Sequence, residues 1–168
     1  MNTKTQKEIR VLLADDHEIV RAGLRSLIEI EPDVRVIADV GSGRHAVELT
    51  RLKRPEVVVM DISMPDMNGI EATRRITGDP KSRVLCLSMH KEKRMIVAML
   101  KAGASGYLVK SCAAQELNEA IHVVVSGKIY ISPSLGIGDL DDYVREQRKP
   151  KQGAFAAVTD REREVLQL

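Results

Sequence analysis

Five polar side chains stand at the ends of apolar segments in this sequence, where chemistry is usually placed in an α/β protein. They are Asp15 and Asp16, Asp61, Ser88, and Lys110. If the apolar segments are parallel strands, their carboxyl ends share one edge of a sheet. We therefore expect these three carboxylates, one hydroxyl and one ammonium to lie close together.

Such a cluster favours phosphoryl chemistry on Asp61. Three like charges repel one another, and burial would raise the pKa of at least one of them. A hard divalent cation with oxygen ligands, typically Mg²⁺, would relieve that repulsion. Mg²⁺ on one side of Asp61 and Lys110 on its far side would both hold the pKa of this carboxyl down. A carboxylate with a lowered pKa is a poor general base and is better suited to act as a nucleophile. The oxygens of an incoming phosphoryl group would be shared among Mg²⁺, Lys110 and the Ser88 hydroxyl.

Strands that alternate with helices must position these residues. We expect strands over 9–14, 34–40, 57–60, 84–87 and 106–109, and helical patterns over 20–28, 46–52, 70–76, 91–102 and 117–124. Gly103 should end the fourth helix as its C-cap. Right-handed crossovers favour a five-stranded, doubly wound parallel sheet in the order 2-1-3-4-5. In that order the first and third strands are neighbours, which brings Asp15 and Asp16 beside Asp61.

The charge composition is typical of the surface of a soluble globular domain. The net charge is +2 with 30% charged residues, which gives no support to general nucleic-acid binding by this chain. The longest uncharged run, 129–138, is too short to cross a bilayer. The polar N-terminus lacks the apolar core of a signal peptide, so a cytoplasmic location is expected. Cys86 and Cys112 are expected to be reduced thiols.

Four motifs together resemble the receiver domain of two-component response regulators over about residues 9–127. They are Asp15-Asp16, Met60-Asp61-Ile62-Ser63-Met64-Pro65 with Gly69, Ser88-Met89-His90, and Gly106-Tyr107-Leu108-Val109-Lys110. The resemblance implies a flavodoxin-like receiver fold and phosphoryl transfer from a sensor histidine kinase to Asp61. It implies self-phosphorylation and slow dephosphorylation, and no turnover of an external substrate, so the chain is not expected to be an enzyme in that sense.

The resemblance also implies a set of metal ligands. Asp16 and Asp61 would ligate Mg²⁺ directly, with the backbone carbonyl of Ser63 as a third protein ligand. Asp15 would act mainly through a bound water. No metal role is expected for His17, His45 or His122, which open or lie on helices without partners at ligand spacing.

Other residues would hold the phosphoryl group and respond to it. Ser88 and Lys110 would bind its oxygens, and Tyr107 would rotate inward when Ser88 is drawn to the phosphate; the alternative is an ordinary half-buried tyrosine. Ser63 and His90 would tune the lifetime of the phosphoryl group. The residue after Lys110 is serine, where many receivers have proline, so the isomer of that peptide bond is left open.

The C-terminal residues 158–168 resemble the beginning of a LuxR-type helix-turn-helix. Val-Thr-Asp-Arg-Glu at 158–162 follows the usual Leu-Thr-x-Arg-Glu, and its threonine and glutamate form a capping box. We expect a receiver over 1–127, a linker over 128–157 and a truncated output domain over 158–168. The alternation over 128–132 is enough for a short extended segment at the start of the linker. This places the parent protein among NarL/FixJ-type transcription regulators, with a homodimer on phosphorylation. Specific DNA binding is expected only of the complete output domain, because the recognition helix is missing here.

Three alternatives compete with this interpretation. A Mg²⁺-dependent phosphohydrolase with an aspartyl nucleophile usually carries Asp-x-Asp after its first strand, and Asp15-Asp16-His17 lacks the second acid. A nucleotide-binding module would rest on 41–43, a Gly-Ser-Gly that lacks the third glycine. A phosphorylation-independent interaction domain would leave the acceptor residues unused.

Overall fold

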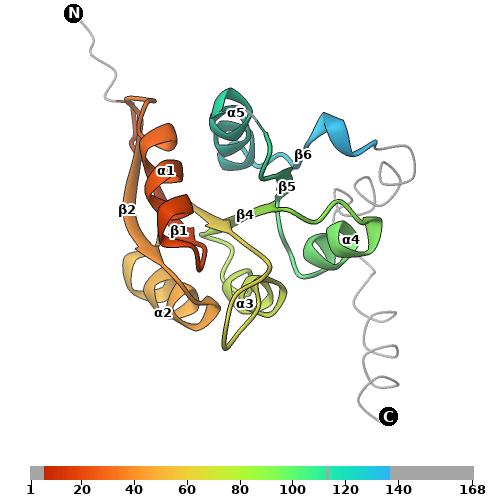
Figure 1. The fold of residues 1–168 in the computed structure, drawn as a ribbon. Coiled ribbons are helices and arrows are strands. Elements are labelled where there is room, and N and C mark those ends of the chain that lie inside the picture. Colours follow the sequence, from red (N-terminus) through yellow and green to blue (C-terminus); the bar gives the residue numbers. More distant parts are fainter. Residues whose placement is uncertain (1–5, 113, 137–168) are drawn as a thin grey trace, which may run out of the picture. The chain divides into compact units, whose positions relative to one another are not determined.

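Six parallel strands form one sheet in the order β2-β1-β3-β4-β5-β6 (Figure 1). The computed structural model describes residues 6–112 and 114–136. The strands are β1 (Ile9–Ala14), β2 (Val34–Val40), β3 (Val57–Met60), β4 (Arg83–Ser88), β5 (Gly106–Val109) and β6 (Tyr130–Ile131). The predicted order of the first five strands is confirmed.

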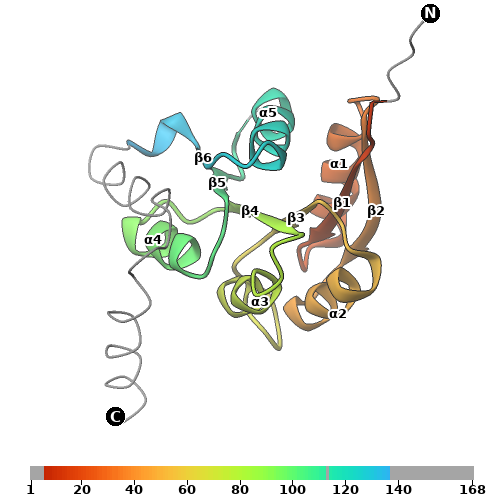
Figure 2. The ribbon, with the colours of Figure 1, turned by 180° about the vertical axis from the view of Figure 1, so that it is seen from behind.

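Helices cover both faces of the sheet, as the doubly wound fold requires. They are α1 (Glu18–Ile28), α2 (Gly43–Lys53), α3 (Gly69–Ile76), α4 (Lys93–Lys101) and α5 (Ala114–Val125). Figures 1 and 2 show α1 and α5 on one face, and α2, α3 and α4 on the other. None of the helices in the described ranges is both long and apolar enough to span a membrane.

The ends of α4 show how local backbone conformation sets a helix boundary. This helix begins two residues later than expected, because Glu92 is extended at the N-cap, with φ −68° and ψ 132°. It ends as predicted, at a left-handed glycine: Gly103 has φ 108°, and its N–H donates to the carbonyl of Leu100 at 3.0 Å.

A sixth strand extends the sheet beyond the predicted five. β6 pairs in parallel with β5, and the N–H of Ser132 donates to the carbonyl of Tyr107 at 3.0 Å. The buried hydroxyl of Ser132 donates to Glu116 Oε1 on α5 at 2.6 Å. The compact unit therefore continues past residue 127, to Gly136. The remainder of the expected linker and the expected output-domain segment, 137–168, lie outside the described residues.

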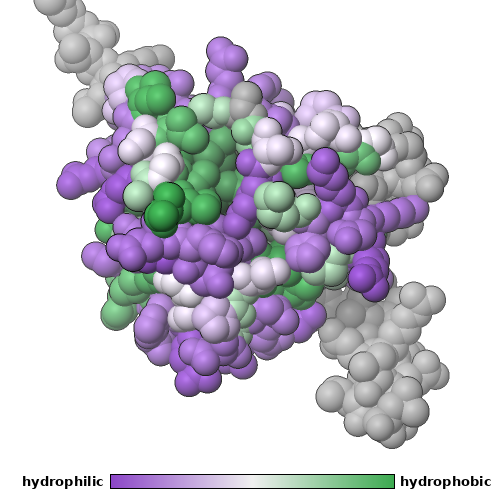
Figure 3. All heavy atoms as spheres, in the orientation of Figure 1, coloured by the Kyte–Doolittle hydropathy of each residue, from purple (hydrophilic) through white to green (hydrophobic). Residues whose placement is uncertain are grey.

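The core is aliphatic and lies on both sides of the central strands. Every residue of β3 is buried, which matches its run of Val-Val-Val-Met. On α1, Ile28 is fully buried, whereas Ile19 is 89% exposed and Ile30, just after the helix, is 67% exposed. Figure 3 shows apolar side chains gathered over α1 and between α1 and α5. Ile19 and Ile30 thus contribute little to the core of the described unit.

Candidate functional site

The strand register brings the predicted residues to one edge of the sheet. Ala14 of β1 pairs with Met60 of β3, so Asp61 follows directly beside the end of β1. The N–H of Asp61 donates to the carbonyl of Ala14 at 2.9 Å, and that of Lys110 to the carbonyl of Ser88 at 2.9 Å. Backbone pairing, which the sequence pattern predicts, thus fixes where these side chains begin.

Lys110 bridges two carboxylates. Its Nζ lies 2.6 Å from Asp15 Oδ2 and 3.1 Å from Asp61 Oδ2. The expectation that Lys110 lies on the far side of Asp61 is wrong, because the ammonium lies between the two acids and nearer to Asp15. Burial opposes the charged form of Lys110, but the two carboxylates outweigh it and raise the pKa of the lysine. The Lys110–Ser111 peptide bond is trans.

The two buried acids that share Lys110 have opposite pKa shifts. Burial favours the neutral form of Asp15, but hydrogen bonds from Lys110 and from the backbone N–H of His17 outweigh it and lower the pKa. Burial also dominates at Asp61 and, with repulsion from Asp15, raises the pKa despite the attraction of Lys110. The expectation that one pKa in the cluster is raised is confirmed. Without a metal ion desolvation is the larger effect at Asp61, so Lys110 alone does not hold its pKa down.

A histidine joins the acidic cluster. His17 Nδ1 lies 3.1 Å from Asp15 Oδ1 and 3.0 Å from Asp16 Oδ1. One donor atom from each of Asp15, Asp16, His17 and Asp61 lies within 4.8 Å of the others. The expectation that His17 lacks partners at ligand spacing is wrong, because its ring lies against the acid pair that directly precedes it.

The donor set fits a divalent cation. Asp15 Oδ2 is buried, and its neighbour at 2.6 Å is the Lys110 ammonium, which Asp61 also shares. Three carboxylates facing one ammonium leave an excess of negative charge, and carboxylate oxygens are preferred ligands of Mg²⁺.

The turn after β3 returns to the strand end and is closed by Gly69. The N–H of Gly69 donates to the carbonyl of Ile62 at 2.8 Å. A Cβ on this glycine would lie 2.0 Å from the carbonyl oxygen of Asp61. Asp66, inside the turn, adopts a positive φ of 65°. The turn places Ser63 at the mouth of the site, where its Oγ lies 3.2 Å from His90 Nε2.

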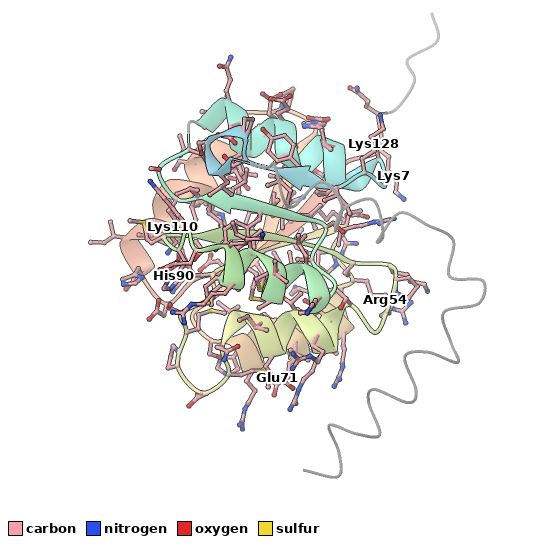
Figure 4. The ribbon with its side chains drawn as sticks, turned by 90° about the vertical axis from the view of Figure 1, so that its right-hand side faces the viewer. Lys7, Arg54, Glu71, His90, Lys110 and Lys128 are labelled. Carbon is pink, nitrogen blue, oxygen red and sulfur yellow. The ribbon has the colours of Figure 1, made fainter. Side chains whose placement is uncertain are left out.

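Ser88, His90 and Tyr107 form a second group at the same edge. The buried Ser88 Oγ accepts the N–H of His90 at 3.1 Å, and the hydroxyl of Tyr107 donates to the carbonyl of His90 at 2.7 Å. Tyr107 is fully buried, so its ring is already directed inward, and burial raises the pKa of its hydroxyl. Figure 4 shows His90 and Lys110 at one edge, with Arg54 at the opposite edge.

A doubly wound parallel sheet with an acid–lysine cluster at its carboxyl edge defines a receiver-type α/β domain. The response regulator receiver domain family matches residues 11–122. The chain belongs to the family of response regulator receiver domains.

Similar proteins include a transcriptional regulatory protein and response regulators. The transcriptional regulatory protein DegU of Brevibacillus brevis is 38% identical, with 97% of this chain and 75% of the relative covered. The response regulator UvrY of Escherichia coli K12 is 37% identical, with 94% of this chain and 72% of the relative covered. A solved LuxR-family two-component response regulator from an Aurantimonas species is 38% identical, with a TM-score of 0.76, 82% of this chain and 99% of that chain covered.

Proposed function

We propose that this chain is the phosphoacceptor part of a transcriptional response regulator, with Asp61 as the residue that receives the phosphoryl group. The observation that carries the proposal is the bridging ammonium of Lys110, 3.1 Å from Asp61 and 2.6 Å from Asp15. A buried carboxylate beside a fixed cation is placed to attack an incoming phosphoryl group, whose oxygens the cation and nearby donors can hold.

In the proposed reaction, a carboxylate oxygen of Asp61 forms a P–O bond while the P–N bond of a kinase phosphohistidine breaks. The leaving imidazole takes up a proton, and Lys110 and Ser88 donate to the phosphoryl oxygens. Asp15, Asp16, Asp61 and the backbone carbonyl of Ser63 would hold Mg²⁺, which supplies charge neutralisation when bound. Water later hydrolyses the acyl phosphate, so the chain acts on itself and not on an external substrate.

The partners follow from the same proposal. A sensor histidine kinase would donate the phosphoryl group, and phosphorylation would favour a homodimer. DNA would be bound only through a complete LuxR-type output domain, and such a regulator would work in the cytoplasm. The names of the relatives, transcriptional regulatory protein and response regulator, support this assignment.

Two pairs of residues would set the response. Tyr107 and Ser88 would form the switch, since both are buried and both bond to His90. Ser63 and His90 would tune the phosphoryl lifetime, because their side chains meet at the mouth of the site.

Acetyl phosphate with Mg²⁺, read by intact-protein mass, tests the proposal. We expect the wild type to gain one phosphoryl group that hydroxylamine removes, as an acyl phosphate should. The Asp61→Asn variant should not be labelled. Asp66 is an exposed acid in the turn that follows, and as a control the Asp66→Asn variant should be labelled like the wild type. Labelling of Asp61→Asn to the wild-type extent would refute Asp61 as acceptor. Steady turnover of a small phosphate ester, which a receiver should not hydrolyse, would instead favour the phosphohydrolase.

A further inference from the structure

We infer that Arg21 is a positioning residue for the candidate cation site. Its guanidinium joins the carbonyl of Asp15 to the side chain of Asp39 on β2, and so fixes the backbone from which the carboxylate of Asp16 projects. The inference rests on the proposed function in one respect, since it takes Asp16 as a ligand of the divalent cation. It adds a residue from outside the acid–lysine cluster on which tight binding of the ion depends.

The guanidinium of Arg21 bridges two strands at the carboxyl edge of the sheet. Its Nη1 donates to the carbonyl of Asp15 at 2.7 Å, and its Nε donates to Asp39 Oδ1 at 3.1 Å. The side chain of Arg21 is only 18% exposed. Hydrogen bonds from a charged donor are stronger than those between neutral groups. The end of β1 is thus attached to β2 by a side chain as well as by the backbone.

Local structure directs the arginine to this place. Arg21 lies in the first turn of α1, where its N–H donates to the carbonyl of His17 at 3.0 Å. Backbone pairing between the strands reaches the N–H of Asp15, which donates to the carbonyl of Val40 at 3.1 Å. Gly41, just after β2, leaves room for the guanidinium, because a Cβ there would lie 3.2 Å from Arg21 Nη1. Arg21 therefore continues the attachment of β1 at the carbonyl of Asp15.

Asp16 depends on this attachment more than Asp15 does. The carboxylate of Asp15 is held by Lys110 at 2.6 Å and by the N–H of His17 at 2.9 Å. The side chain of Asp16 is 34% exposed, and it contacts the ring of His17, which is 64% exposed, at 3.0 Å. Because a peptide unit is planar, the direction of the Asp15 carbonyl also sets the direction of the bond to Asp16. Fixing that carbonyl limits the positions open to the Asp16 carboxylate.

Arg25 provides a matched comparison on the same helix. Its Nη1 donates to the other oxygen of Asp39, Oδ2, at 3.0 Å, and its Nη2 donates to the carbonyl of Val36 at 3.0 Å. Each arginine thus combines an ion pair with Asp39 and a hydrogen bond to a backbone carbonyl. Only the carbonyl that Arg21 binds belongs to the acid pair. Loss of either arginine should destabilise the fold, but only loss of Arg21 should weaken binding of the ion.

The sign of the effect separates positioning from charge. Removing a cation near a group of carboxylates would, by charge alone, strengthen the binding of a divalent cation. Loss of positioning weakens that binding, because the freed carboxylate must be ordered when the ion binds. Partners that orient metal ligands contribute about 10–100-fold to metal affinity. Arg21 acts through the backbone, so we expect the lower end of that range.

Mg²⁺ titration of the full chain by calorimetry, without a phosphoryl donor, tests the inference. We expect Arg21→Met to bind Mg²⁺ about tenfold more weakly than the wild type, and Arg25→Met to bind it like the wild type. Circular dichroism at the titration temperature checks that both variants are folded. In acetyl phosphate labelling, Arg21→Met should need about tenfold more Mg²⁺ for half of its maximal rate, with the rate at saturating Mg²⁺ close to that of the wild type.

A milder variant keeps the test decisive if Arg21→Met does not fold. Arg21→Lys retains the charge, but an ammonium lacks the planar fork that reaches the Asp15 carbonyl and Asp39 together. We expect this variant also to bind Mg²⁺ more weakly than the wild type. An affinity equal to or above that of the wild type in the folded Arg21 variant overturns the inference.

The other outcomes separate the inference from the proposed function. An equal loss of Mg²⁺ affinity in Arg25→Met overturns the inference, because it would show a general effect of loosening α1. Absence of Mg²⁺ binding by the wild type overturns it as well. If Asp61 is labelled but the Arg21 variants keep the wild-type affinity, only the inference fails. If the Arg21 variants lose affinity but Asp61 of the wild type is not labelled, only the proposed function fails.

Discussion

Gly69 is the position where a single added methyl group should do the most damage to the candidate site. A Cβ there would lie 2.0 Å from the carbonyl oxygen and 2.8 Å from the carbonyl carbon of Asp61, and 2.8 Å from the Cα of Ile62. All three atoms are backbone, so no side-chain rotation can make room. The Gly69→Ala variant must therefore move the end of β3 or break the 2.8 Å hydrogen bond from Gly69 to Ile62.

The expected cost follows from the rigidity of that contact. Overpacking a well-packed region costs about 1–3 kcal/mol, and a backbone clash belongs at the upper limit. A loss of about 3 kcal/mol corresponds to a melting temperature lower by roughly 10 °C for a domain of this size. Because the displaced atoms carry Asp61, the variant should also lose metal binding at the cluster.

A matched glycine provides the control. Gly23 lies in the interior of α1, and apart from its chain neighbours and the backbone of its own helix no described atom lies within 4 Å of the position of its Cβ. Alanine is favoured over glycine in a helix interior by about 1 kcal/mol, so Gly23→Ala should raise the melting temperature by a few degrees. Both variants are compared by thermal and urea unfolding, followed by circular dichroism. If Gly69→Ala is as stable as the wild type, the steric argument is wrong.

Three further substitutions test the charges and hydrogen bonds of the fold. His122 Nδ1 contacts the carbonyl of Asn118 at 2.7 Å and Nε2 contacts Asp33 Oδ2 at 2.8 Å, which raise its pKa. The stabilisation of the fold by these contacts is therefore complete below the ordinary pKa of about 6.5 and is lost as pH rises through the raised folded-state pKa. In urea unfolding, His122→Asn should therefore lose more free energy of unfolding at about pH 6 than at about pH 9. Equal losses at the two pH values would contradict this. Tyr107→Phe removes the hydroxyl that bonds to His90 and should lower the free energy of unfolding by about 1 kcal/mol, and an unchanged urea midpoint would be evidence against that bond. Lys110→Met leaves two buried carboxylates without their cation and should lower the free energy of unfolding by roughly 3 kcal/mol near neutral pH. The loss should be smaller in acid, where the carboxylates protonate. A loss independent of pH would show that the ion pairs are not responsible.

The fold was predictable wherever the chain alternates long apolar runs with turn residues. Five strands satisfy that condition, and the right-handed crossover rule leaves one favoured order for them. β6 satisfies it only in part, because the alternation over 128–132 indicates a short extended segment but not that this segment joins the sheet. Its place depends on tertiary contacts, above all the hydrogen bond between Ser132 and Glu116 on α5.

The site was predictable as a set of residues but not in its internal geometry. The strand ends fix where Asp61 and Lys110 leave the backbone, and that much is visible in the sequence. The direction of a long lysine side chain depends on where the negative potential is greatest, and here that lies between Asp15 and Asp61. The same limit applies to His17 and to His122, which was expected to lack a partner and instead contacts Asp33. A ring's contacts depend on its rotamer and on residues distant in sequence.

The opposite pKa shifts of Asp15 and Asp61 bear on which acid is the nucleophile. Asp15 is held as a stable anion by Lys110 and by the backbone N–H of His17, which lowers its pKa and makes its oxygens weaker nucleophiles. Asp61 has only Lys110 and the N–H of Ile62 against a larger desolvation, so its anion is less stabilised and more basic. When the surroundings shift the pKa values of two neighbouring acids in opposite directions, the two acids commonly have different chemical roles. Of the two buried acids that share Lys110, the proposed phosphoacceptor is thus the one whose anion the fold stabilises less.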